Sequence, residues 1–157
     1  MHKTNAIRIL DKEQITYRIH EYPWSEEHLD AVTAAEKVGM PCEKVFKTLV
    51  ATGDKTGVIV GCIPAENELD LKSFAKVSGN KKVEMLAMKE LENITGYIRG
   101  GCSPIGMKKR FPTYVASAAV NMDTIVISAG KRGLQIEISP ADLQQVTDAV
   151  FADITVS

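Results

Sequence analysis

The chain has 157 residues, which is about the size of one domain, and its 45% hydrophobic and 25% charged residues are ordinary for a globular protein. Its net charge of -1 excludes a protein that attracts polyanions through overall charge alone. No apolar run approaches the roughly eighteen residues that a membrane span needs. The first residues, MHKTNAIRIL, show no secretory signal, so we expect a cytoplasmic protein.

Cysteines and histidines are the residues that would hold a metal or form disulfides. The sequence has three of each, all far apart: Cys42, Cys62, Cys102, His2, His20 and His28. They form no C-x-x-C pair and no H-E-x-x-H motif. We therefore expect reduced thiols, no bound metal and no other cofactor.

The N-terminal third predicts two helices and a strand. Thr4 can cap a helix that runs to about Lys12. ITYRIHEY, residues 15–22, alternates polar and apolar residues as a strand does. TAAEKVG then predicts a helix that begins with a capping box at Thr33 and ends at Gly39.

The middle of the chain predicts a β-hairpin followed by two helices. Segments 45–52 and 58–63 are both strand-like and flank the turn sequence GDKTG. LDLKSFAKVSG predicts a helix with Asp70 as its cap and Gly79 as its end, and MKELENITG predicts a shorter helix before Gly96.

The C-terminal third returns to strands. Residues 113–120 and 124–129 are β-rich, and AGKRGL turns the second of them into the strand QIEIS. SPADLQQVTDAVFADI predicts a final helix over 139–154, with Ser139 as its cap and Pro140 in its first turn. The whole chain, 1–157, is thus expected to be a single α+β domain with a mixed, curled, barrel-like sheet flanked by helices.

Lys47 breaks the pattern of the first hairpin strand. With a period of two, it shares a face with the apolar residues Val45, Leu49 and Ala51. A lysine is almost never fully buried without a partner, because desolvating an ammonium is costly. Either this face opens onto a polar site, or Lys47 extends along apolar surface at an edge with its ammonium in water.

Basic residues gather in three probable loops. These loops contain Lys81, Lys82, Lys108, Lys109, Arg110, Lys131 and Arg132. Solvated loop charges are the ordinary explanation for each. If the loops converge on one side, they form a rim that contacts the phosphates of a nucleic acid.

GYIRGGCSPIGMKKR is poor in side chains, because Gly100, Gly101, Pro104 and Gly106 lie within seven residues. In such a loop backbone N–H groups can approach a carbonyl or a phosphate closely, although a plain turn explains the sequence as well. The segment lacks the pattern of a phosphate-binding P-loop. Cys102 lies within it, and a buried structural cysteine is a commoner case than a nucleophile.

Five motifs together resemble one family. VFKTLV, LDLK, KKVEM, TGYIRGGCSPIGMKKRFPT and ISAGKRGLQIEIS, in this order and with these gaps, are similar to the YbaK family of aminoacyl-tRNA deacylases, from Ala6 to about Ile154. The resemblance is strongest to the Cys-tRNA(Pro) deacylases, relatives of the prolyl-tRNA synthetase editing domain. The resemblance implies the fold of the prolyl-tRNA synthetase editing domain. It also implies removal of cysteine from mischarged tRNA(Pro) at its acceptor end, and a transient complex with prolyl-tRNA synthetase.

The resemblance also implies which residues act. The family's positions fall here on Lys47, Gly100, Pro104, Tyr22 and Ser128. One departure is Gln135, where the resemblance leads us to expect an acid.

In the reaction that the resemblance implies, the thiol of the bound cysteine attacks its own ester and leaves as a cyclic thiolactone. Lys47 and the Gly100 backbone would stabilise the oxyanion, while Tyr22, Gly101, Pro104 and Ser128 would position the substrate. Tyr22 as a rim aromatic and Ser128 as a strand serine bonded to backbone remain alternatives. A deacylase specific for alanine or of broader specificity, or a tRNA-binding module without catalysis, would use the same pocket.

Overall fold

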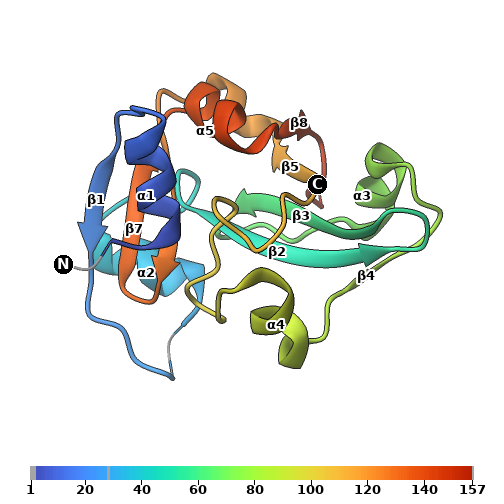
Figure 1. The fold of residues 1–157 in the computed structure, drawn as a ribbon, viewed down its shortest axis with the longest axis horizontal. Coiled ribbons are helices and arrows are strands. Elements are labelled where there is room, and N and C mark those ends of the chain that lie inside the picture. The colour runs from blue at the N-terminus through green and yellow to red at the C-terminus, as the bar shows by residue number, and fades with distance from the viewer. Residues whose placement is uncertain (1–2, 28, 157) are drawn as a thin grey trace.

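The computed structural model of the chain describes residues 3–27 and 29–156 (Figure 1). The helices are α1 (Asn5–Lys12), α2 (Ala31–Val38), α3 (Leu71–Ser78), α4 (Leu91–Thr95) and α5 (Pro140–Thr147), with 3-10 turns η1 (Met88–Glu90) and η2 (Ser117–Asn121). The strands are β1 (Arg18–Glu21), β2 (Phe46–Gly53), β3 (Gly57–Pro64), β4 (Val83–Met85), β5 (Thr113–Ala116), β6 (Ile125–Lys131), β7 (Leu134–Ile138) and β8 (Val150–Ala152).

The strands form two sheets. Three strands make an antiparallel sheet in the order β1-β7-β6, and five make a mixed sheet in the order β4-β2-β3-β5-β8. In the mixed sheet, β5 runs parallel to both β3 and β8. A parallel bridge from Val45 to Val126 joins the two sheets, which do not close into a barrel. The predicted α+β class with a mixed sheet is confirmed, with the strands divided between two sheets.

Several predicted helix ends are confirmed by their capping hydrogen bonds. The Ile7 N–H donates to Thr4 Oγ1 at the start of α1. Asp70 accepts from two backbone N–H groups at the start of α3, and Gly79 ends that helix with φ of 80°. The left-handed conformation at such an end favours glycine, because a Cβ is strained there.

The start of α2 is a correction. The cap is Asp30 and not Thr33, because the Asp30 carboxylate accepts a hydrogen bond of 2.7 Å from the Thr33 N–H. Aspartate and threonine are both good caps. Because Asp30 caps the helix three positions earlier, Thr33 lies inside the first turn. The predicted end at Gly39 is confirmed.

Three predicted elements are shorter than their patterns. The strand expected at 15–22 begins only at Arg18, because Gln14, with φ of 59°, ends a turn that follows α1. The strand expected over 113–120 ends at Ala116, where η2 begins. The last helix ends at Thr147, because Asp148 adopts a left-handed φ of 57°, and the chain then forms β8 beside β5.

One hydrophobic core joins both sheets. Ile7 and Leu10 of α1 pack in the same buried cluster as Ile127 and Ile136 of the small sheet and Phe74 of α3. This core fixes β2 and β6 relative to each other, and the site described below lies between them. Within the described chain, no helix has the length and apolar character needed to cross a bilayer.

Candidate active site

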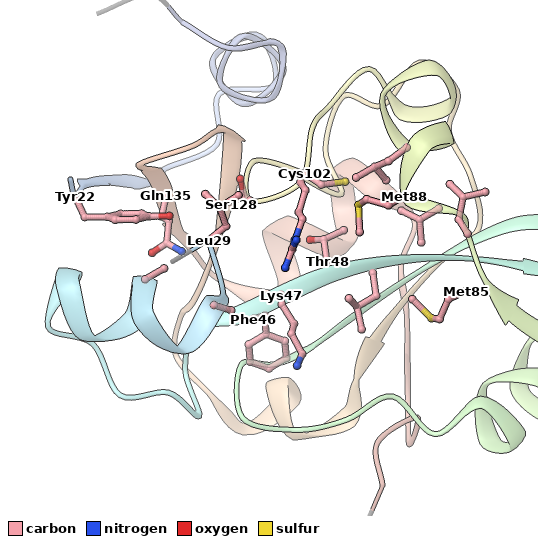
Figure 2. A pocket seen from close by; sticks show the side chains of 18 residues that line it. Tyr22, Leu29, Phe46, Lys47, Thr48, Met85, Met88, Cys102, Ser128 and Gln135 are labelled. Carbon is pink, nitrogen blue, oxygen red and sulfur yellow. The ribbon is translucent and has the colours of Figure 1, made fainter. Parts of the chain in front are cut away.

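A cavity of about 210 Å³ lies along one edge of β2 (Figure 2). The short strand β4 pairs only with the end of β2, at Ala51–Gly53. The preceding stretch of β2, residues 46–50, therefore lines the cavity. Leu86, which follows β4, and Leu91, the first residue of α4, add apolar side chains to the lining.

Lys47 brings a cation to this apolar cavity. Its side chain is half-buried and lines the cavity, and it leaves β2 in the opposite direction to Thr48 (Figure 2). Within residues 3–27 and 29–156, no carboxylate forms an ion pair with its ammonium. A positive charge without a protein partner is available to an anionic group of a ligand.

Of the glycine-rich loop, Gly100 reaches the cavity. It has φ of 82°, and a Cβ added to it would lie 3.2 Å from Leu29 Cδ2. Gly101 is turned away, because its N–H donates to Ile98 O at 2.9 Å. Pro104 lines a second cavity of about 120 Å³. The structure therefore brings Gly100 and Lys47 to the same cavity, whereas Gly101 and Pro104 are not among the residues that line it.

Tyr22, Ser128 and Gln135 form the polar end of the cavity, with Ser128 and Gln135 on the three-stranded sheet and Tyr22 directly after β1 (Figure 2). Burial raises the pKa of the Tyr22 phenol. The Ser128 hydroxyl oxygen accepts a hydrogen bond of 3.2 Å from the Gly130 N–H. Gln135 is only 6% exposed, and its side-chain oxygen has no hydrogen-bond partner in the described part of the chain.

Cys102 also lines the cavity, but its chemistry is that of a buried thiol. Burial raises the pKa of Cys102 to about 11 and that of Cys62 to about 12. The nucleophilic form of cysteine is the thiolate, so Cys102 is a poor nucleophile near neutral pH. Cys42, Cys62 and Cys102 form no disulfide in the structure.

Of the three basic loops, the one at the β6–β7 turn adjoins the cavity wall. The position of a Cβ on Gly100 is 3.6 Å from Arg132 Cγ, and Lys131 precedes Arg132 in the turn. Lys81 and Lys82 lie before β4, at the other end of β2 (Figure 1).

The third loop lies toward α5 and the second cavity. Arg110 pairs with Asp148 at 2.6 Å, and Lys108 donates to Asn93 O at 3.0 Å. Lys109 lines the second cavity with Arg110. Of the three basic loops, the structure therefore brings to the pocket the one that contains Lys131 and Arg132, and the other two lie elsewhere.

Several residues of the site have no signal in the sequence. Leu29, Met85, Met88 and Arg99 line the cavity because separate loops meet there. No local periodicity reports such a meeting, because it depends on tertiary packing.

A partly buried ionic cluster around Glu137 was also not predicted. Glu137, two residues after Gln135 on β7, accepts hydrogen bonds from Thr124, His20 and Lys44. These bonds, with that of Thr124 the strongest cause, lower the pKa of Glu137 to about 2. The one available signal was the alternation of QIEIS, which places Gln135 and Glu137 on the same face.

The described residues contain no group of three or more histidine, cysteine or acidic side chains placed to hold a metal ion. His2 and His28 lie outside the described residues.

Comparison with known families decides the relationship. Residues 25–146 match the family model of the aminoacyl-tRNA editing domain. The chain belongs to this family. The resemblance to YbaK proteins that the five motifs indicated is thereby confirmed.

Individual relatives agree with the family. The chain is 55% identical, over 98% of its length and 93% of the relative's, to an Enterococcus faecalis protein named "Putative Cys-tRNA(Pro)/Cys-tRNA(Cys) deacylase EbsC". It is 27% identical over 122 residues to the Bacillus subtilis protein YwhH, which is 77% of each chain.

Two solved structures share the fold. One is the hypothetical protein APE2540, with a TM-score of 0.88, 22% identity and coverage of 98% of this chain and 100% of that one. The other is described as "a putative trans-editing enzyme for prolyl tRNA synthetase", with a TM-score of 0.84, 23% identity and full coverage of both chains. At these identities the likeness concerns the fold alone, and the editing-domain fold is confirmed.

Proposed function

We propose that this chain is a trans-editing deacylase that removes cysteine from Cys-tRNA(Pro) and from Cys-tRNA(Cys). The name of the 55% identical Enterococcus faecalis relative, which aligns with nearly the whole chain, supports this substrate class. Family membership supports action on the aminoacyl end of a tRNA. In this proposal residues 1–157 work as one editing domain.

The observation that carries the proposal is that Lys47, which forms no ion pair with a carboxylate in the described part of the chain, and Gly100 line the same small, mostly apolar cavity. Attack on an ester carbonyl creates a negative oxygen, and a cation or a backbone N–H donor that faces this oxygen lowers the barrier. Lys47 and the Gly100 backbone are the groups that we assign to this task. Tyr22 and Ser128 position the aminoacyl group at the polar end.

The nucleophile in this proposal is the substrate's own thiol. Its thiolate attacks the ester carbonyl, so that a carbon–sulfur bond forms and the bond to the 3' oxygen of the tRNA breaks. The tRNA leaves with that oxygen, which takes up a proton, and the cysteine leaves as a cyclic thiolactone. Attack within one molecule needs only correct orientation, which a closely fitting pocket provides. The raised pKa of Cys102 supports this choice over a protein nucleophile.

Selection of the tRNA body needs a further source of recognition. The cavity is large enough for an aminoacyl group but far too small to enclose any part of a tRNA body. We propose that a transient complex with prolyl-tRNA synthetase supplies the tRNA, which would favour Cys-tRNA(Pro) over correctly charged Cys-tRNA(Cys) as the substrate. Because tRNA charging takes place in the cytoplasm, we place the protein there.

A deacylase for alanine is the second candidate, because the apolar wall of Leu86 and Leu91 suits a methyl side chain equally well. The test is to charge one tRNA(Pro) with cysteine or with alanine and to measure the release of each. Faster release of cysteine supports the proposal, and faster release of alanine supports the second candidate. Binding of tRNA with release of neither amino acid would make the protein a binding module.

A further inference from the structure

Trp24 is an exposed aromatic residue beside the pocket. It is the single tryptophan of the chain, it lies between β1 and α2, and 44% of its surface is exposed. The guanidinium carbon of Arg132 lies 5.3 Å from the centre of its ring, in a cation–π contact. We call these two side chains the Trp24–Arg132 platform. An exposed indole beside a guanidinium is a surface on which a flat aromatic ligand stacks.

The fold holds this platform in place. The Tyr22 N–H donates to Gly133 O at 2.9 Å, which joins the β1–α2 connection to the β6–β7 turn. Lys37 of α2 donates a hydrogen bond of 2.8 Å from its ammonium to Pro23 O. A Cβ at Gly133 would lie 2.7 Å from Trp24 Cδ1, so glycine permits the close contact between indole and turn. The indole is therefore positioned by its neighbours although much of it is exposed.

Arg132 connects the platform to the pocket. Its Nε donates to Arg99 O at 2.9 Å, and its Cγ is 3.6 Å from the position of a Cβ on Gly100. Arg99 and Gly100 both line the pocket. In the part of the chain that the structure describes, neither arginine forms an ion pair with a carboxylate. Their positive charge therefore remains available beside the platform.

The size of the pocket determines what must lie outside it. At about 210 Å³ it is smaller than the cavities of about 300–1,000 Å³ that enclose drug-sized ligands. It can hold an aminoacyl group, but the nucleoside that carries this group must lie at the entrance.

Resting on the proposed function, we propose that the Trp24–Arg132 platform stacks the terminal adenine of the tRNA while the aminoacyl ester occupies the pocket. Aromatic rings and arginine planes are the two kinds of side chain that stack on unpaired bases. Arg99 and Arg132 also place positive charge where the adjacent phosphate of the acceptor end lies.

Fluorescence tests this proposal without any measurement of catalysis. Because Trp24 is the only tryptophan, the emission of the full chain reports the platform directly. We expect an uncharged acceptor-stem microhelix RNA that ends in CCA to quench this emission to saturation. The same RNA with an abasic 3'-terminal nucleotide should quench little and bind about tenfold more weakly, in keeping with base–aromatic stacking. Equal quenching and equal affinity for the two RNAs would overturn the proposal.

Kinetics supply a second test. Trp24→Ala should raise KM for Cys-tRNA(Pro) about tenfold with kcat nearly unchanged, because stacking contributes equally to substrate and transition state. Trp24→Phe should restore most of the loss. Val120→Ala is the matched control, since Val120 is 57% exposed on η2 and does not line the pocket.

The two proposals fail in different ways. An unchanged KM in Trp24→Ala, with cysteine still released, overturns the platform and leaves the deacylase in place. Adenine-dependent quenching without any release of cysteine supports the platform and overturns the deacylase.

Discussion

Ser128 of β6 and Gln135 of β7 lie directly opposite each other in the antiparallel pair, and both line the pocket. They differ in how their polar atoms are satisfied. Ser128 Oγ accepts from the Gly130 N–H, whereas the Gln135 side-chain oxygen is buried with no partner among residues 3–27 and 29–156. An unsatisfied buried acceptor destabilises a protein by about 1–3 kcal/mol. Without a hydrogen-bond donor from a ligand, the Gln135 oxygen is therefore a destabilising group at the polar end of the pocket.

Gln135→Met should raise the free energy of unfolding by about 1 kcal/mol, because an apolar side chain of similar shape removes the unsatisfied acceptor. Urea denaturation measures this change. Gln144→Met is the matched control, since the Gln144 amide donates to Ala149 O at 3.0 Å, and this variant should lose stability. A loss of stability in Gln135→Met as large as in the control would contradict the prediction.

Lys47→Ala should slow the release of cysteine by about two orders of magnitude, because the variant lacks the cation assigned to the developing oxyanion. The fold should be as stable as before or slightly more stable, since a half-buried lysine is removed from an otherwise apolar strand face. Single-turnover release from Cys-tRNA(Pro) measures the rate. The control is Lys76→Ala, because Lys76 is exposed on α3, and this variant should keep the full rate. Full activity in Lys47→Ala would remove Lys47 from the mechanism.

Elements with local signals could be predicted from the sequence. The β2–β3 hairpin was evident from two strand-like runs around GDKTG, and the ends of α3 from Asp70 and Gly79. Lys47 was identified because a charged residue interrupts an apolar face, which is visible without tertiary information. These features depend on residues close in the chain, so their physical cause is contained in the sequence.

Features that depend on distant residues could not be predicted. Strand β8 has three residues, and its place is set by parallel pairing with β5 rather than by its own pattern. The contact between Trp24 and Arg132 joins two turns that are far apart in sequence. Among the glycines of the loop, the direction in which each N–H points depends on how the loop packs, and the sequence treats Gly100 and Gly101 alike.

Salt dependence should distinguish the basic loops. Each phosphate contact of a protein contributes about -0.7 to -0.9 to the slope of log affinity against log salt. The double variant Lys131→Gln, Arg132→Gln should therefore flatten the slope for tRNA by about 1.5. The matched double variant Lys81→Gln, Lys82→Gln should leave it unchanged, because these lysines lie at the other end of β2. Equal flattening by both would instead support a rim made by several loops.

Glu137 should stabilise the fold only where it is ionised. Hydrogen bonds from Thr124, His20 and Lys44 lower its pKa from 4.5 to about 2. Because the folded-state pKa lies below the unfolded value, the stabilisation is complete above about pH 4.5 and is lost as the pH falls toward 2.

The variant Glu137→Gln should thus lower the free energy of unfolding at pH 7 by about 2 kcal/mol, and the difference from wild type should shrink toward pH 2. Urea denaturation across this pH range measures both. Glu84→Gln is the control, because Glu84 pairs with Lys82 at an exposed site and should change stability by less than about 1 kcal/mol. A difference that stays constant with pH would show that the Glu137 carboxylate is not responsible.

Two thiols compete for the role of nucleophile, and their pKa values separate them. Burial raises the pKa of Cys102 to about 11, whereas an unperturbed cysteine thiol, such as that of the substrate, ionises near 8.5. If the substrate thiol attacks, the single-turnover rate should rise with pH to a plateau with a midpoint near 8.5. A midpoint near 11 would instead indicate Cys102.

The cysteine-free enzyme completes this test. In the triple variant, alanine replaces Cys42, Cys62 and Cys102. Because Cys62 is fully buried, its replacement could disturb the core, so circular dichroism must verify the fold. The triple variant should keep most of the activity, since the enzyme supplies orientation and oxyanion stabilisation but no sulfur. A tRNA charged with S-methylcysteine should release its amino acid far more slowly, because the alkylated sulfur cannot form a thiolate. Two outcomes together would contradict this prediction: a folded triple variant that is inactive, and rapid release of S-methylcysteine by the wild type. They would identify Cys102 as the nucleophile, because Cys102 is the one of the three cysteines that lines the pocket.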